Sequence, residues 1–168
     1  MLKKYHTFFA SPLGTVQVSC NNDCITRVHF LQEADRPSAP DDLQTGAPPV
    51  LQLCVYELKA YFQGQGRKFE VPICQEGTVF QQRVWNELLN IPYGKTISYL
   101  TLSKRLGDPA AIRAAAATNG KNDIAVIVPC HRVIGSNNDL VGYAGGLWRK
   151  KWLLELEAKI TWGVQTLF

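Results

Sequence analysis

No stretch of the 168-residue sequence approaches the roughly 18 consecutive apolar residues that span a bilayer. The first residues, Met1 to His6, also lack the apolar segment of a secretory signal. We therefore expect a cytoplasmic protein with no membrane partner. Hydrophobic residues make up 46% of the chain and charged residues 19%, which is typical of a globular protein and allows one domain or two small ones.

The sequence also lacks a disulfide framework. It has five cysteines, an odd number without regular spacing, so we expect reduced thiols. A structural metal site is not evident either. The residues of the first half that could gather around a metal are His6, Cys20, Cys24 and His29.

Positive charge is scarce in the first half of the chain and concentrated in the second. Residues 1–76 carry seven Lys and Arg against eight Asp and Glu, a net −1, whereas residues 77–168 carry eleven against six, a net +5. A basic surface of this kind suits phosphate groups. Solvated lysines without a partner would give a similar count, so the asymmetry supports a nucleic-acid partner without establishing one.

The first half predicts a small α/β scaffold domain over 1–76. Three β-rich segments, 5–10, 15–20 and 24–30, are separated by turn residues, as in an antiparallel meander. A polar loop over 33–49 leads to a helix predicted over 50–62 by its apolar spacing. Residues 69–73 predict a short edge strand, because Pro72 cannot donate to a central ladder.

The second half, residues 77–168, predicts a helical domain. Thr78 caps one helix, Ser98 caps a second, and Asp108 with Pro109 begins a third over 110–119. The second and third form a helix-turn-helix pattern, although two helices that merely pack together give the same pattern. A final helix is predicted over 147–159. The residues predicted to face inward are Leu100, Leu102 and Leu106 in the second helix and Leu147, Trp152, Leu153, Leu156 and Ile160 in or after the last.

The apolar, β-branched run from Ile124 to Ile134 predicts a buried strand, which Pro129 ends so that Cys130 lies at the strand end. A free cysteine is most often a packing residue. His131 and Arg132 favour a reactive thiol instead, since a neighbouring base or cation stabilises a thiolate. No second Cys or His lies at short ligand spacing, which argues against a metal site at Cys130.

The segment from Pro129 to Val133 resembles the active-site motif of the O6-alkylguanine-DNA alkyltransferases, also called methylated-DNA-protein-cysteine methyltransferases. The resemblance covers the C-terminal half in order. Its other motifs are Phe80 to Trp85, Ile91 to Lys95, Ser98 and Tyr99, Ile112 and Arg113, Asn119 to Asn122, Gly142 to Leu147, and Lys150 to Leu154.

The resemblance implies a ribonuclease-like α/β domain followed by a helical, winged-helix-like domain that binds double-stranded DNA. It implies direct repair of O6-alkylguanine, with irreversible transfer of the alkyl group to Cys130 after base flipping. Such a protein reacts once, needs no cofactor and is expected to be a monomer. Some members carry zinc in the first domain, but the ligand positions do not line up when the turns at Ser11 to Gly14 are matched, so we predict no metal.

Four residues match the family's reacting groups. Cys130 is the nucleophile. His131 points to the other side of an extended chain, so it would take the thiol proton through a bridging water. Glu157, rather than Glu155, matches the residue that orients the imidazole. Tyr99 matches the residue that donates a proton toward guanine N3 as the base leaves.

Other matches describe contacts with the DNA and the base. Small side chains over 110–119 allow close approach to a groove, and Arg113 matches the arginine that fills the gap left by the flipped nucleotide. Asn122 matches a hinge between this helix and the active-site strand, although a helix-ending Asn in the left-handed conformation is an equally good reading. The further DNA contacts are Tyr99, Ala114, Asn119 and Lys121. The base pocket comprises Val133, Tyr143, Ala144, Gly145 and Trp148.

Within this pocket, the family's pattern has the carbonyls of Cys130 and Val133 accept from the exocyclic amine of guanine, while the amide of Ala144 donates to O6. The chain departs from that pattern at Ala116, Asp123 and Trp148, so the range of alkyl groups and the use of O4-alkylthymine stay open.

Two other functions fit parts of the sequence. One is a non-catalytic lesion binder, but relatives of that kind replace the cysteine. The other is a cysteine hydrolase that uses Cys130 and His131, against which their adjacency and the Ala-rich helix both argue.

Overall fold

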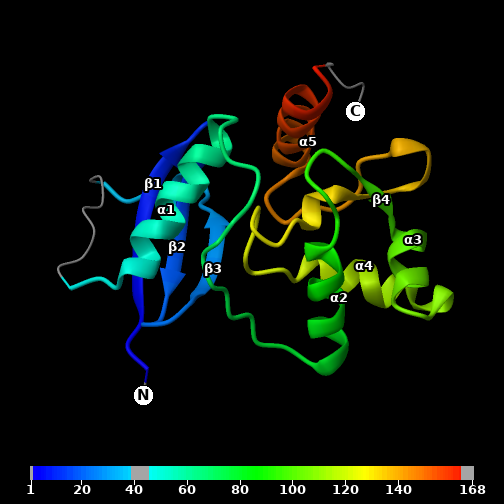
Figure 1. The fold of residues 1–168 in the computed structure, drawn as a ribbon, viewed down its shortest axis with the longest axis horizontal. Helices are drawn as coiled ribbons and strands as arrows, with labels where there is room; N and C mark the ends of the chain where they lie inside the picture. Colours follow the sequence, from blue (N-terminus) through cyan, green and yellow to red (C-terminus); the bar gives the residue numbers. More distant parts are fainter. Residues whose placement is uncertain (1, 39–45, 164–168) are drawn as a thin grey trace. The chain divides into compact units, whose positions relative to one another are not determined.

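The fold is described from a computed structural model for residues 2–38 and 46–163. The chain divides into two compact units, Met1–Gln75 and Glu76–Phe168. Figure 1 follows the elements of both units along the chain. The predicted fold class is confirmed, since a small sheet with a helix precedes a mainly helical unit. No helix in the described ranges is long and apolar enough to cross a membrane.

The N-terminal unit is built on an antiparallel sheet of three strands in the order β1-β2-β3. The strands are β1 (Tyr5–Ser11), β2 (Gly14–Cys20) and β3 (Ile25–Phe30). Buried and exposed residues alternate along them, as one covered face requires. Asn21 fixes the second turn because its side-chain oxygen accepts from the amides of Asp23 and Cys24, at 2.8 and 2.9 Å. The predicted meander is confirmed.

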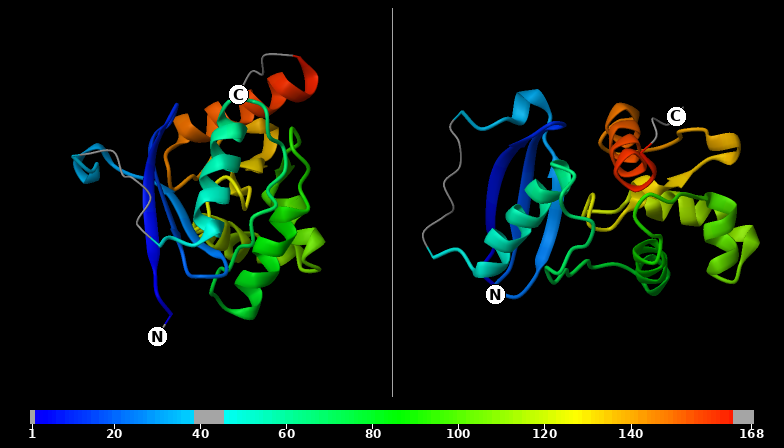
Figure 2. Two further views of the ribbon diagram at one scale, coloured as in Figure 1. Left: turned by 60° about the vertical axis from the view of Figure 1, so that its left-hand side comes forward. Right: turned by 45° about the horizontal axis from the view of Figure 1, so that its top comes forward.

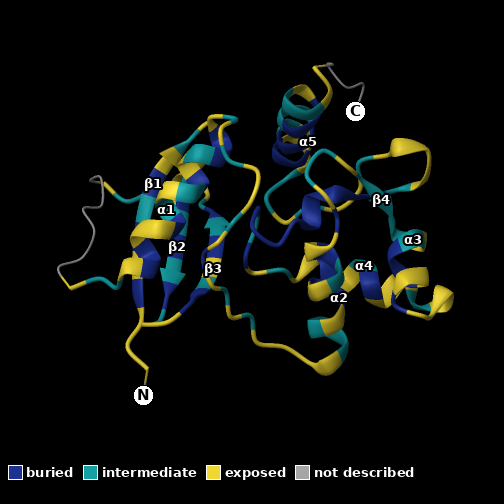
Figure 3. Cartoon of the chain, in the orientation of Figure 1, coloured by how far each residue is buried: buried dark blue, intermediate teal, exposed yellow. Residues whose placement is uncertain are grey.

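Helix α1 (Pro49–Phe62) covers one face of this sheet, as both views in Figure 2 show. It buries a stripe that includes Leu51, Cys54 and Leu58. Figure 3 marks the buried residues of the chain in dark blue. Part of the predicted 33–49 loop forms a short turn, η1 (Glu33–Asp35). Residues 39–45 of that loop lie outside the described residues.

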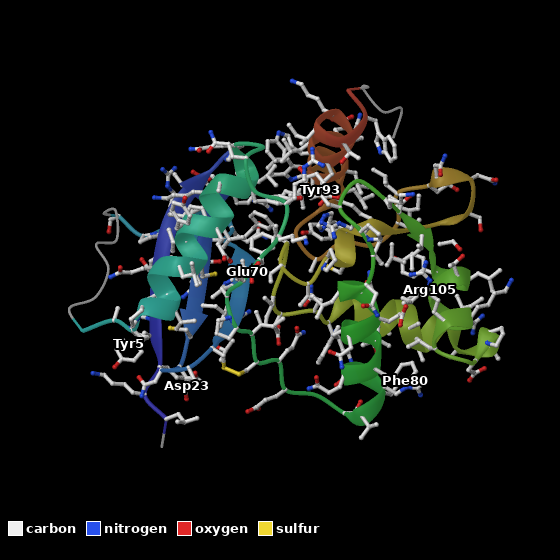
Figure 4. All side chains as sticks on the ribbon, viewed as in Figure 1. Tyr5, Asp23, Glu70, Phe80, Tyr93 and Arg105 are labelled. Atoms are coloured by element: carbon white, nitrogen blue, oxygen red, sulfur yellow. A yellow bond between two sulfur atoms is a disulfide. The ribbon has the colours of Figure 1, made fainter. Side chains whose placement is uncertain are left out.

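The segment after α1 corrects two predictions. Residues 69–73 form no strand, because only Ile73 pairs with the sheet, through a parallel bridge to Ile25. Glu57 instead accepts from the amides of Glu70 and Val71. The bridge brings the Cα atoms of Cys24 and Cys74 to 5.7 Å, and their sulfurs form a disulfide, visible as a yellow bond in Figure 4. The expectation of five reduced thiols is therefore wrong for these two.

The C-terminal unit contains four α-helices, two very short strands and three short 3-10 turns among its described residues. The helices are α2 (Val79–Leu89), α3 (Tyr99–Arg105), α4 (Ile112–Gly120) and α5 (Leu147–Trp162). The strands β4 (Ile97–Ser98) and β5 (Val133–Ile134) pair in parallel. The turns are η2 (Pro109–Ala111), η3 (Cys130–Arg132) and η4 (Ser136–Asn138).

The predicted caps are confirmed. Thr78 and Gln81 form a capping box at α2, Ser98 accepts from the amide of Thr101 at α3, and Asp108 accepts from the amide of Ala110. The third helix nevertheless starts with the 3-10 turn η2, so its α-helical part begins at Ile112. Leu100 and Leu147 are exposed rather than inward-facing.

The prediction of a strand over 124–134 is wrong for most of its length, and this correction changes the position of Cys130. Only Val133 and Ile134 form a strand, whereas residues 124–129 form an irregular buried loop. Val126 has φ +70°, and bonds such as the Val128 amide to the Ile124 carbonyl (3.0 Å) turn the chain. Residues 124–129 are apolar because they are buried, and they form no strand because the chain turns within them. Cys130 therefore precedes a strand instead of ending one.

The disulfide generates a stability prediction. Replacing Cys24 by Ser opens a covalent link between residues 50 apart in sequence and should lower the free energy of unfolding by about 2–4 kcal/mol. Urea unfolding with and without a thiol reductant measures this change. The reductant should destabilise the unmodified chain and leave Cys24→Ser unchanged. Alkylation of five thiols after unfolding in urea without a reductant would contradict the assignment.

Candidate active site

Cys130 begins the turn η3, and its side chain is only 6% exposed. Burial raises the pKa of the Cys130 thiol, while a hydrogen bond from Asn122 and the positive charge of Lys150 lower it by less. The thiol is therefore protonated at neutral pH. It needs a base before it can act as a nucleophile.

His131 is the residue that the sequence predicts as that base. Its ring is buried, with Nε2 2.9 Å from Oε1 of Glu157. Burial lowers the pKa of His131 and the Glu157 carboxylate raises it by less, so the imidazole is neutral at neutral pH. Because an ionised carboxylate can only accept, we assign the proton to Nε2 and the lone pair to Nδ1. Nδ1 is buried without a hydrogen-bond partner among the described residues.

Glu157 lies on α5 with its side chain fully buried. Its carboxylate also accepts from Nε and Nη2 of Arg132, the latter at 2.7 Å. Burial raises the pKa of the Glu157 carboxyl, but the charges and hydrogen bonds of His131 and Arg132 lower it by more, to well below its usual range. Glu155 instead pairs with Lys151 at the surface. The residue that contacts the histidine is therefore Glu157, the one expected from the sequence.

The same cluster holds the loop between α2 and β4. Nη1 of Arg132 donates to the Ile91 carbonyl at 2.7 Å, and the amide of Gly94 donates to Glu157 at 3.3 Å. Gly94 has φ +78°, and a Cβ there would overlap Thr161, so this position requires glycine. Tyr93, labelled in Figure 4, lies beneath the Arg132 guanidinium, 5.6 Å from it to the ring centroid.

Asn122 fastens the irregular loop that leads to the cysteine. Its side-chain nitrogen donates to the carbonyls of Val128 (2.8 Å) and Ile124 (3.3 Å), and its oxygen accepts from the Ile124 amide (3.1 Å). Asn122 does not have a positive φ, so it is not a left-handed helix terminator. Of the two readings of this residue, the structure favours the one in which it connects the end of α4 to the active-site segment.

Asn119 requires a correction. The sequence predicts a DNA contact, yet the side chain is 3% exposed and faces the protein interior. Its Nδ2 donates to the carbonyl of Cys130 at 3.2 Å. Helical spacing explains the difference, because Asn119 lies one position beyond Thr118 and four beyond Ala115, on the buried face of α4.

Lys150 is a buried cation beside the predicted base pocket. Its Nζ donates to the carbonyls of Val133, Val141 and Gly142, at 2.6, 2.9 and 3.2 Å. Burial lowers the pKa of Lys150 to about 8. Tyr99 donates to the same Val141 carbonyl at 3.1 Å, and burial raises its pKa. The Val133 carbonyl therefore already has one charged donor.

The remaining pocket candidates lie in the turn before α5 and in its first turn. Burial raises the pKa of Tyr143 well above its usual range, and the nearby Cys130 adds to the effect. Ala144 is exposed. The Gly145 carbonyl accepts from Nη1 of Arg149 at 2.7 Å, and the Arg149 guanidinium stacks 4.5 Å from the Trp148 ring centroid. Trp148 itself is 57% exposed, so it forms a rim rather than a buried wall.

The exposed face of α4 carries the other candidates for DNA contact. Arg113 and Ala114 are exposed, as is Lys121 just beyond the helix. Trp85 anchors the opposite side of α4, because its Nε1 donates to the Thr118 carbonyl at 3.1 Å. The helix thus presents a long cation and small side chains to solvent while its other face contacts the active site.

Two residues of the site were missed by the sequence analysis in their actual roles. Arg132 was expected to favour the thiolate, but it binds Glu157, and Lys150 was named only as part of a family motif, with no role predicted for it. Arg132 gives one signal, since a cation next to an apolar segment needs a buried partner. Among the described residues, no three His, Cys, Asp or Glu side chains are grouped to hold a metal ion.

The buried ion pair generates the next prediction. Arg132→Met leaves the Glu157 carboxylate buried without its main counter-charge and should lower the free energy of unfolding by about 3–5 kcal/mol. A matched control is Arg105→Met, because the Arg105–Glu87 pair is partly exposed at 3.7 Å and should contribute less than about 1 kcal/mol. Urea unfolding near neutral pH compares the two variants.

The stability lost in Arg132→Met should depend on pH, because Arg132 changes the pKa of Glu157. In the unmodified chain the lowered pKa of Glu157 stabilises the fold above the unfolded value of about 4.3, and this contribution is lost as pH falls toward the folded pKa. Without Arg132, burial raises that pKa, so the variant is penalised most at neutral pH. The difference in free energy of unfolding between the unmodified chain and Arg132→Met should therefore become smaller as pH falls from about 7 to about 4. A stability difference that does not change with pH would contradict the assignment of an ion pair between Arg132 and Glu157.

Comparison with known proteins places these residues in a family. Residues 4–75 match the family description "6-O-methylguanine DNA methyltransferase, ribonuclease-like domain", and residues 79–159 match "6-O-methylguanine DNA methyltransferase, DNA binding domain". The methylated-DNA–protein-cysteine methyltransferase of Mycobacterium bovis is 43% identical over 158 residues, which is 94% of each chain. The constitutive enzyme of that name from Bacillus subtilis is 39% identical over 156 residues, 91% of this chain and 94% of the relative.

Solved structures agree. The O6-methylguanine methyltransferase of Mycobacterium tuberculosis superposes with a TM-score of 0.82 at 40% identity, covering 95% of both chains. The OGT of the same organism in complex with DNA gives a TM-score of 0.80 at 42% identity, covering 92% of this chain and 93% of the other. This chain therefore belongs to the 6-O-methylguanine DNA methyltransferase family, the family of the methylated-DNA–protein-cysteine methyltransferases.

Proposed function

We propose that this protein repairs DNA by moving an alkyl group from O6 of guanine to the sulfur of Cys130. The observation that carries the proposal is the contact of His131 with Glu157 next to a protonated, buried thiol. Family membership supports the same chemistry. The protein acts as its own acceptor, because a thioether has no easy route to hydrolysis, so each molecule reacts once.

The reaction begins with removal of the thiol proton. His131 accepts it at Nδ1 through a bridging water, and Glu157 stabilises the imidazolium through its bond at Nε2. The sulfur attacks the alkyl carbon, and the bond between that carbon and O6 breaks. The electron pair stays on guanine, which leaves as an anion and takes a proton at N3 from Tyr99. The proton on His131 then restores Tyr99 through solvent.

The role of Arg132 follows from its contacts. Its guanidinium holds both carboxylate oxygens of Glu157, so the acid cannot turn away from the histidine. It also keeps Glu157 ionised. Arg132 is therefore a positioning residue for the base.

Access to the reacting carbon requires the nucleotide to leave the duplex, because an O6 substituent points into the base stack. The small side chains on α4 allow its backbone to approach the groove, and exposed Arg113 fills the gap in the stack. Ala114, Lys121 and Tyr99 complete the proposed DNA contacts. Asn122 links this helix to the loop before Cys130.

The base is held by main-chain groups. The carbonyls of Cys130 and Val133 accept from the exocyclic amine, the amide of Ala144 donates to O6, and Tyr143 stacks near the sulfur. Gly145 permits close approach of the backbone. Trp148, on the exposed rim, lies where a large O6 substituent would emerge.

The proposal assigns scaffolding to residues 1–76 and both DNA binding and alkyl transfer to residues 77–168. The chemistry needs neither a metal nor a cofactor. We propose that the protein acts as a monomer on double-stranded DNA containing O6-alkylguanine, in the cytoplasm.

Intact-mass spectrometry after incubation with a duplex containing O6-methylguanine tests the transfer. The protein should gain the mass of one methyl group, and peptide mapping should place it on Cys130. Cys130→Ala should gain nothing, whereas Cys54→Ala, which removes another buried cysteine, should react normally. An unchanged mass of the unmodified protein would refute the function.

Arg113→Ala tests the contact with the duplex. Its transfer rate from duplex DNA should fall at least about tenfold, since refilling the stack offsets unpairing costs of a few kcal/mol. Its rate with free O6-benzylguanine should be nearly unchanged. Arg27→Ala, which removes an exposed arginine from β3, is the charge-matched control. Equal losses on both substrates would remove Arg113 from this role.

A further inference from the structure

Asn119 has contacts that its place on a DNA-facing helix does not explain. Arg113 and Ala114 on the same helix are exposed, whereas Asn119 is only 3% exposed. Nδ2 donates to the Cys130 carbonyl at 3.2 Å. Oδ1 is buried and has no hydrogen-bond partner among the described residues. A buried acceptor without a donor is costly, so this arrangement needs a reason.

The Cys130 carbonyl has a second donor as well. The amide of Val133 closes the turn η3 by donating to it. A carbonyl oxygen has two lone pairs, so Val133 and Asn119 occupy both. The Val133 amide is fixed by the backbone of the turn, whereas the Asn119 side chain can rotate. Any third donor to this oxygen must therefore displace Asn119.

The other neighbour of Asn119 is the Tyr99 hydroxyl. Burial and the charge of Cys130 raise the pKa of Tyr99, and a hydrogen bond donated by the Asn119 amide lowers it by less, so the two side chains are close. Tyr99 donates to the Val141 carbonyl at 3.1 Å and leaves Oδ1 of Asn119 unpaired. Asn119 thus lies between the Cys130 carbonyl and Tyr99. These are the groups that the proposed function assigns to the exocyclic amine and to N3 of guanine.

The chemistry of the carboxamide matches that edge of the base. On guanine, an acceptor at N3 stands next to a donor amine, and on asparagine the acceptor Oδ1 stands next to the donor Nδ2. We propose that Asn119 is a specificity-determining residue that holds the place of the guanine exocyclic amine on the Cys130 carbonyl until the flipped base enters. This inference rests on the proposed function.

The exchange has a consequence for substrate choice. A base with an exocyclic amine forms a hydrogen bond to the Cys130 carbonyl but displaces the one from Asn119. The amine therefore adds little net binding free energy. A base without the amine, such as hypoxanthine, leaves Asn119 in place and loses little. Asn119 therefore weakens discrimination between O6-alkylguanine and O6-alkylhypoxanthine. Removing its amide should sharpen that discrimination.

Single-turnover transfer rates test this with two otherwise identical duplexes, one containing O6-methylguanine and the other O6-methylhypoxanthine. The variant Asn119→Leu keeps the side-chain size and removes both polar atoms. We expect the ratio of the guanine rate to the hypoxanthine rate to rise about fivefold, the value of one ordinary hydrogen bond. Asn90→Ala, an amide removed from the exposed end of α2, should leave the ratio unchanged. Asn119→Ala provides a second variant if Asn119→Leu does not fold.

An equal change of both rates would show that Asn119 only fills space, and a fall in the ratio would show that it orients the carbonyl for the amine. Either result overturns the proposal. If the unmodified protein transfers methyl from neither duplex, the proposed function fails and this inference fails with it. If it transfers normally and the ratio does not rise in the variant, the inference alone is wrong.

Discussion

The enclosed carboxylate of Glu157 is the constraint around which the C-terminal unit is arranged. It accepts from Arg132, His131 and the Gly94 amide, and so ties the turn at Cys130 and the loop before β4 to α5. A buried ion pair adds little net stability, because desolvation offsets much of the attraction. Its contribution is geometric, since these contacts fix the positions of three segments relative to one another. The histidine proposed as the base is held by the same contacts that hold the fold.

This arrangement separates the acid–base work from the thiol. Glu157 remains ionised and His131 remains neutral, so one imidazole nitrogen binds the acid and the other is available as a base. Burial meanwhile keeps Cys130 protonated. A thiol in that state reacts slowly with stray electrophiles, which suits a protein that can react only once.

The loop before Cys130 depends on side chains rather than on a sheet. Asn122 and Asn119 connect the end of α4 to the loop and to the Cys130 carbonyl, and Lys150 secures the Val133 carbonyl on the other side. The helix proposed to meet DNA is therefore bonded directly to the peptide of Cys130, the proposed nucleophile. Both asparagines act through main-chain groups, so the base pocket is shaped largely by backbone whose position side chains determine.

Local patterns in the sequence predicted much of this protein. The turns of the meander, the capping residues Thr78, Ser98 and Asp108, and the amphipathic spacing of α1 each depend on neighbours within a few positions, so they are readable from sequence alone. The resemblance at Pro129 to Val133 pointed to Cys130, His131 and Glu157. Only the tertiary structure decided that residues 124–129 form a loop, because burial selects the same β-branched residues in a loop and in a strand. The tertiary structure likewise decided the contacts between residues distant in sequence. These are the Arg132–Glu157 pair, the contacts of Lys150, the bond from Asn119 to the Cys130 carbonyl and the Cys24–Cys74 disulfide. Sequence periodicity does not indicate which distant groups come into contact.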